Sequence, residues 1–104
     1  MGERNVVKFK DIVKISNPFD IDETYKIDEY INKTVYIGDF KVVQGNNFDV
    51  VYMLVYDPEL KREVVVTTTS KVIASQLERI REVLDEGKMV EATVRKRKRY
   101  YCLE

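Results

Sequence analysis

The chain has 104 residues, 44% of them hydrophobic, and its eighteen basic and eighteen acidic side chains give a formal net charge of zero. This size predicts one domain with a modest core and excludes a deep catalytic cavity covered by a lid. One cysteine excludes an internal disulfide, and histidine is absent, so we expect no metal, no cofactor and no enzymatic activity. No apolar run approaches the roughly 18 residues of a membrane span, so we expect a cytoplasmic protein without a membrane partner.

The charges are segregated along the chain. Residues 11–30 carry six acidic and two basic side chains, whereas residues 88–104 carry six basic and two acidic ones. We expect residues 1–30 to form an N-terminal extension that packs on a domain of residues 31–104. One hypothesis is that this acidic extension covers the basic end and competes with an anionic ligand. The alternative is that the extension only stabilises the domain.

The first half of the chain predicts a short turn of helix near Tyr30 and then three strands. Residues 34–43 are rich in β-branched and aromatic side chains, and Gly38 within them predicts a bulge or a sharp bend. Turn residues follow, and then a second strand at residues 48–56. A proline-containing turn leads into a third strand at residues 63–69. These patterns predict three consecutive antiparallel strands.

Residues 71–86 are the one long helix that the sequence predicts. Ser70 is a suitable N-cap because its hydroxyl can accept a hydrogen bond from the first turn, and Gly87 can adopt the left-handed conformation that ends a helix. Two further strands are expected after the helix, at residues 89–96 and 100–103. The buried face is marked by apolar residues spaced four, three and four apart, namely Ile73, Leu77, Ile80 and Leu84.

Three strands, one helix and a closing hairpin are the order of elements in the OB fold, a five-stranded Greek-key barrel. The expected fold class is therefore mainly β. It is a five-stranded OB barrel with one helix at about residues 71–86 between strands three and four, plus an N-terminal extension. A small α+β sheet and an SH3-like barrel also use five short strands, but a sixteen-residue helix at this point fits them less well.

Four segments between residues 30 and 104 carry a further pattern. They are Tyr36-Ile37-Gly38-Asp39-Phe40, Gln44-Gly45-Asn46-Asn47-Phe48 followed by Tyr52, Thr69-Ser70-Lys71-Val72-Ile73 with Gln76-Leu77, and Lys98-Arg99-Tyr100-Tyr101. In this order they resemble the single-stranded DNA-binding OB-fold proteins of phages and archaea, including replication protein A-like OB domains. The resemblance implies binding of single-stranded DNA in replication, recombination or repair, without catalysis. It also implies replication or recombination proteins as further partners.

The residues themselves give a separate reason to expect nucleic acid. Five consecutive cations, from Arg95 to Arg99, repel one another unless an anionic partner or an acidic patch compensates them. Cations that follow phosphates beside aromatic rings that stack on bases are what a single strand requires. Strand alternation turns only one of Tyr100 and Tyr101 outward, and Tyr100 is the better stacking candidate. The alternative is a solvated hairpin tip with Tyr101 in the core.

Aromatic residues of the first two strands complete the candidate site. Tyr36 and Phe40 flank Gly38 and could seat a base, although a bulge in a packed strand explains the glycine equally well. Tyr52 shares a strand face with Phe48 and other large residues, and this face is either a base-stacking platform or the barrel interior. The candidate nucleic-acid-binding residues are Arg95, Arg97, Lys98, Arg99, Tyr100, Tyr36, Phe40, Lys41 and Tyr52.

Other functions stay open at this point. An OB-fold protein-protein interaction module and an RNA-binding accessory protein are the alternatives, because a fold does not determine a function. Binding by an interaction module should persist at high salt, whereas a single-strand binder should weaken steeply. The sequence also leaves the oligomeric state open between a monomer and a weak dimer.

Overall fold

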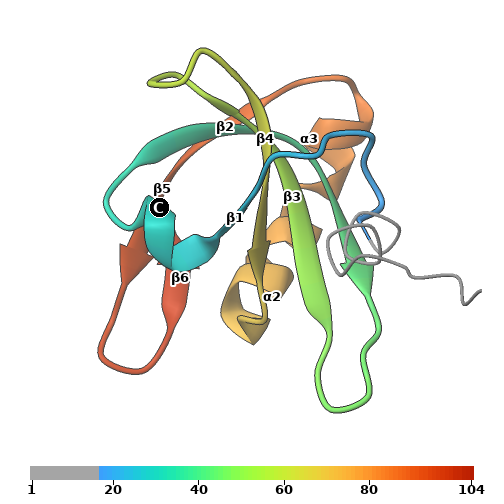
Figure 1. Ribbon diagram of the computed structural model, residues 1–104, viewed down its shortest axis with the longest axis vertical. Helices are drawn as coiled ribbons and strands as arrows, with labels where there is room; N and C mark the ends of the chain where they lie inside the picture. The colour runs from blue at the N-terminus through green and yellow to red at the C-terminus, as the bar shows by residue number, and fades with distance from the viewer. Residues whose placement is uncertain (1–16) are drawn as a thin grey trace, which may run out of the picture.

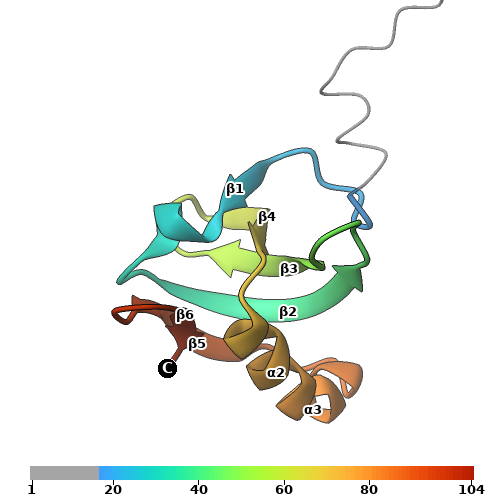
Figure 2. The same cartoon turned by 90° about the horizontal axis from the view of Figure 1, so that it is seen from below.

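The computed structural model of the protein describes residues 17–104 (Figure 1). These residues form one mixed six-stranded sheet in the order β1-β4-β3-β2-β5-β6, with short helices. The elements are β1 (Thr24–Lys26), the 3-10 helix η1 (Ile27–Tyr30), β2 (Thr34–Val43), β3 (Val50–Asp57), β4 (Arg62–Thr68), α2 (Lys71–Arg79), α3 (Arg81–Asp85), β5 (Val90–Lys96) and β6 (Tyr101–Leu103). The sheet is curved. The segment before β1 lies on one side of it, and both α-helices lie on the other side (Figure 2).

Strands β2, β3 and β4 form the antiparallel meander that the sequence predicts. The register between β2 and β3 shifts between Ile37 and Asp39, which confirms the bulge expected at Gly38. Along β3, alternate residues point inward and are buried, while Tyr52 and Tyr56 lie half-buried on the outer face. The short helical turn expected near Tyr30 is also present, as η1.

The predicted single helix is instead two helices with a break at Ile80. Ser70 caps α2 as expected, because its Oγ accepts a hydrogen bond from the Ile73 amide at 3.2 Å. At the break, the Ile80 amide bonds to the Leu77 carbonyl three residues back, at 3.1 Å, which tightens the turn and bends the chain. Leu77 and Leu84, on either side of the break, are both buried. The predicted buried face is therefore confirmed, whereas the prediction of one continuous helix was wrong.

The sheet has six strands where five were expected, because part of the N-terminal extension joins it. β1 pairs in parallel with β4. A few residues later, Ile31 forms a parallel bridge to Val94 of β5, and the Asn32 amide donates to the Val94 carbonyl at 2.7 Å. The segment of residues 24–32 therefore contacts both β4 and β5. Three residues are too few to show strand alternation, so β1 left no pattern in the sequence.

One hydrophobic core contains residues from the extension and from the rest of the chain. Ile27 and Tyr30 of η1 are buried together with the inner faces of the sheet and the buried face of α2. The fully buried members with the largest side chains are Phe40, Ile37, Met53, Ile73 and Leu77. Ile27 and Tyr30 of the extension are therefore part of the folded core.

A buried polar pair fixes η1 to the turn between β3 and β4. The Tyr30 hydroxyl donates to Asp57 Oδ2 at 2.6 Å, and Asp57 Oδ1 accepts from the amides of Glu59 and Leu60 at 2.8 and 3.2 Å. Burial, reinforced by Asp57, raises the pKa of Tyr30 well above its usual range. Burial alone would raise the pKa of Asp57, but the hydrogen bonds from Tyr30 and the two amides outweigh it and lower that pKa.

We expect Tyr30→Phe to lower the free energy of unfolding by about 1–3 kcal/mol, because the buried Asp57 carboxylate loses its hydrogen bond from the Tyr30 hydroxyl. Urea unfolding followed by circular dichroism measures this loss. Tyr56→Phe is the matched control: Tyr56 is half-buried on the outer sheet face, so its unfolding free energy should change by less than about 0.5 kcal/mol. Equal stabilities of the two variants would contradict this role of Tyr30.

A second polar contact joins the extension to β4 at the surface. Arg62 donates to both carboxylate oxygens of Glu23, from Nε at 2.6 Å and from Nη2 at 2.7 Å, and the Tyr25 hydroxyl donates to the same carboxylate. The hydrogen bond from Arg62, followed by that from Tyr25, lowers the pKa of Glu23 from 4.5 to about 2. Since the folded-state pKa lies below the unfolded one, the contact stabilises the fold above the unfolded pKa. The stabilisation is lost as the pH falls towards 2.

We therefore expect Arg62→Gln to reduce the acid sensitivity of the protein. The urea midpoint of the native chain should fall more steeply than that of the variant between about pH 5 and about pH 2.5, because only the native chain loses the Glu23 contact there. Arg79→Gln, which alters an exposed arginine of α2, should follow the native curve. Parallel curves for the native chain and Arg62→Gln would rule out this contribution.

Candidate nucleic-acid interface

The hairpin of β5 and β6 presents the basic run of the sequence at one end of the molecule (Figure 1). Its tip is closed by a hydrogen bond from the Arg97 amide to the Tyr100 carbonyl at 2.8 Å, and the residues between them are exposed. Tyr100 is 47% exposed, whereas Tyr101 packs against the core. The prediction from strand alternation that Tyr100, rather than Tyr101, points outward is therefore confirmed.

The five cations of the hairpin do not share one environment. Arg95 and Arg97 both form ion pairs with Glu104, at 3.4 Å for Arg95, whose Nη1 also donates to Asn32 Oδ1 at 2.8 Å. A phosphate would have to compete with these partners. The Lys96 ammonium lies 5.4 Å from the centre of the Tyr101 ring. Part of the negative charge that compensates these cations therefore comes from the same chain, from Glu104, two residues after Cys102.

A cavity of about 560 Å³ lies between this hairpin, the corner of β1 and η1, and the start of α2. Arg99 and Tyr100 line it from the hairpin, Lys26 and Asp28 from the extension, and Lys71 from α2. The hydroxyl-bearing residues at the end of β4 also line it. Two sequence-predicted residues, Arg99 and Tyr100, therefore meet cations that come from distant parts of the chain.

A second cavity of about 400 Å³ adjoins the first on the outer face of the sheet. Both cavities are lined by Lys26, Val50 and Thr67, so they adjoin each other across β3 and β4. Tyr52 lines the second cavity. Lys41 is the cross-strand neighbour of Tyr52 in β2. We call these two cavities the groove. The sequence-predicted residue Tyr52 is part of it, and Lys41 lies beside it.

Phe40 was expected to contact a base, and its position corrects that expectation. Its ring is completely buried, with the Arg81 guanidinium 3.8 Å from the ring centre. The bulge at Gly38 explains this, because it reverses the alternation of β2: Tyr36 points outward before it, and Phe40 points inward after it. Two aromatic residues of the same sequence parity therefore lie on opposite faces.

Tyr36 lies on the outer sheet face, away from the residues that line the groove. Its ring centre is 6.5 Å from that of Tyr56, its cross-strand neighbour. A hydrogen bond with Glu91 of β5 raises the pKa of Tyr36. These contacts give Tyr36 a place in the packing of the outer face, and it lines neither cavity of the groove.

Sequence reasoning missed Lys26 as a residue of the groove. Lys26 was one basic residue in an acidic stretch, and only the parallel pairing of β1 with β4 brings it to the cavity wall. Phe48, which the sequence places on the same possible stacking face as Tyr52, precedes β3 and is 57% exposed. It lies outside the groove, where with Lys71 it lines a smaller cavity beside the start of α2.

The structure bears on part of the hypothesis that the acidic extension covers the basic hairpin. Glu23 is engaged with Arg62, and Glu29 accepts a hydrogen bond from the Lys26 amide at 2.9 Å. Asp28, by contrast, lines the same cavity as Arg99. Residues 11–16 of the acidic stretch lie outside the described residues. Deleting residues 1–30 would remove two core residues of η1, so it would not isolate competition for a ligand.

No protein-family model, curated protein or solved structure matches the chain. The resemblance to single-stranded DNA-binding OB-fold proteins therefore stays a prediction. Within residues 17–104, no cluster of histidine, cysteine, aspartate or glutamate could hold a metal ion. No helix in this part of the chain is both long enough and apolar enough to cross a membrane.

Helix α2 holds the basic hairpin in place through side-chain hydrogen bonds to the β6 backbone. The Gln76 amide donates to the Leu103 carbonyl at 2.9 Å and accepts from the Leu103 amide at 2.8 Å. The Ser70 hydroxyl donates to the Tyr101 carbonyl at 3.1 Å. A glutamine side chain thus replaces a neighbouring strand along the outer edge of β6, which positions Tyr100 beside the start of α2.

We expect Gln76→Ala to lower the free energy of unfolding by about 1–2 kcal/mol, because two hydrogen bonds to the β6 backbone are lost. The Leu103 amide should also exchange with solvent faster, which NMR hydrogen exchange measures. Ser75→Ala changes an exposed residue of the same helix; it should leave the Leu103 exchange unchanged and alter the free energy of unfolding by no more than about 0.5 kcal/mol, through helix propensity. Unaltered exchange at Leu103 in Gln76→Ala would show that α2 does not hold the hairpin.

Proposed function

We propose that the protein binds single-stranded DNA in the groove, through phosphate contacts and base stacking with little sequence preference. The observation that carries the proposal is the meeting of Lys26, Lys71 and Arg99 with the exposed Tyr100 in one cavity, beside a second cavity lined by Tyr52. Cations beside aromatic faces are the features by which single strands are bound without base-specific contacts. Replication, recombination or repair in the cytoplasm is the setting we propose, with proteins of those processes as partners.

We also propose that the fold is an OB barrel. The support is that β2 pairs with both β3 and β5, and that the helices lie between the meander and the final hairpin. OB folds bind oligonucleotides on the face of their second and third strands, between the loop joining strands one and two and the loop joining strands four and five. The corresponding parts here are β3, β4 and the loops at residues 44–49 and 97–100. The groove lies across β3 and β4, beside the second of these loops.

The first test is fluorescence anisotropy of a labelled thymidine oligonucleotide of about 20 nucleotides at several salt concentrations. Preferential binding over duplex is expected, and log affinity should fall with log salt by about 0.7 for each phosphate neutralised. No binding at low salt would contradict the proposal and would favour a protein-interaction module. Tighter binding of a uridine RNA of equal length would instead assign the groove to RNA, which such sites distinguish through the 2′-hydroxyl.

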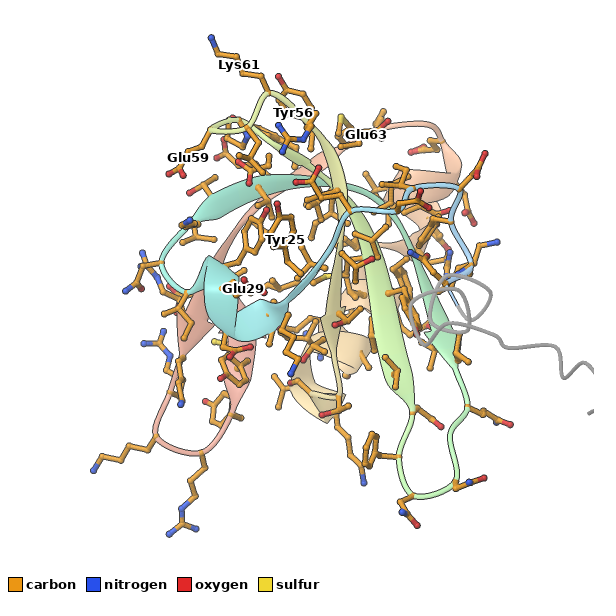
Figure 3. All side chains as sticks on the ribbon, in the orientation of Figure 1. Tyr25, Glu29, Tyr56, Glu59, Lys61 and Glu63 are labelled. Carbon is orange, nitrogen blue, oxygen red and sulfur yellow. The ribbon has the colours of Figure 1, made fainter. Side chains whose placement is uncertain are left out.

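Variants locate the binding. Tyr100→Ala should weaken binding roughly 5- to 150-fold, because stacking contributes about 1–3 kcal/mol per base. Arg99→Gln should weaken binding and reduce the salt slope by about 0.7. Lys61→Gln is the control, since Lys61 lies at the end of the molecule opposite the hairpin (Figure 3). Equal losses in Lys61→Gln and Arg99→Gln would show that binding does not occur in the groove.

A further inference from the structure

Lys26 lies where the two cavities of the groove meet. It is the last residue of β1, it is exposed, and it lines both cavities. Its backbone is fixed twice: it is paired with Thr67 of β4, and its amide donates to Glu29 Oε2 at 2.9 Å. With its backbone fixed, this exposed lysine forms part of the wall of both cavities. This feature belongs to the N-terminal extension, outside the five strands expected of the barrel.

Each cavity has its own exposed or half-exposed aromatic side chain. Tyr100 lines the first, of about 560 Å³, and Tyr52 lines the second, of about 400 Å³. In a single strand, neighbouring bases are joined through one phosphate, so a cation shared by two cavities with aromatic walls can contact the phosphate between two bases. Asp28 also lines the first cavity, and its exposed carboxylate would repel a phosphate bound there.

We infer that the N-terminal extension is part of the nucleic-acid site. Lys26 neutralises the phosphate between two adjacent nucleotides, whose bases occupy the Tyr100 cavity and the Tyr52 cavity, and Asp28 limits the affinity of this site. The ligand is accordingly a single strand of at least two nucleotides. This inference rests on the proposed function, but it assigns the extension a direct role in binding rather than the role of a competitor or of a purely structural support.

The test uses the full chain and the same labelled thymidine oligonucleotide. Lys26→Gln should weaken binding roughly 3- to 10-fold at low salt and reduce the salt slope by about 0.7, because one phosphate contact is lost. Lys26→Arg keeps the charge and should bind within about twofold of the native chain. Asp28→Asn should tighten binding by about two- to fivefold, because a like charge is removed from the cavity wall.

Two control variants make the same charge changes elsewhere. Lys61 and Glu59 both lie at the far end of the molecule (Figure 3). Lys61→Gln and Glu59→Gln should therefore bind within about twofold of the native chain. If the native chain binds and Lys26→Gln matches Lys61→Gln in affinity and salt slope, the inference is wrong and the proposed function stands. Weak binding by Lys26→Arg would likewise overturn the phosphate contact. If the native chain does not bind, both proposals fail.

Discussion

The segment of residues 24–32 holds two distant parts of the sheet together, and the rest of the structure depends on it. β1 pairs with β4, and Ile31 bridges to Val94 of β5, so one short piece of chain contacts strands that do not pair with each other. Between these contacts, η1 places Tyr30 in the core beside Asp57. A lone buried carboxylate would be costly, so each hydrogen bond to Asp57 also fixes the path of the segment. The same path brings Lys26 to the groove.

The opposite wall of the groove is fixed by a different device. Among residues 17–104, no strand pairs with the outer edge of β6, and α2 provides hydrogen bonds to this edge from Gln76 and Ser70. Because Ser70 also caps α2 through the Ile73 amide, one hydroxyl couples the start of the helix to the hairpin. The relative position of Arg99 and Lys71 therefore follows from helix capping as much as from strand pairing. The Ser70 side chain therefore makes both a local hydrogen bond within α2 and a long-range hydrogen bond to β6.

Much of the meander could be predicted from the sequence, and its failures have identifiable causes. The predicted strand at residues 34–43 agrees with β2 because β-branched alternation is a local property. Gly38 predicted a bulge, but the prediction for Phe40 still assumed that inward and outward residues alternate without interruption past Gly38. The bulge shifts this alternation, so Phe40 was assigned to the wrong face. β1 is three residues long and acquires its conformation from β4, so it has no local signal. The pairing of Arg95 and Arg97 with Glu104 likewise depends on the hairpin register.

The zero net charge of the chain does not oppose the proposed function, because the relevant quantity is where the charges lie. Glu59 and Glu63 are at the end of the molecule opposite the β5–β6 hairpin (Figure 3). At the groove, cations outnumber acids in the first cavity, where Lys26, Lys71 and Arg99 face Asp28. Screening at physiological salt limits the reach of a charge to about 8 Å. A strand bound in the groove, as proposed, would therefore experience mainly the local cations. The proposed binding depends on the excess of cations at the first cavity rather than on the net charge of the chain.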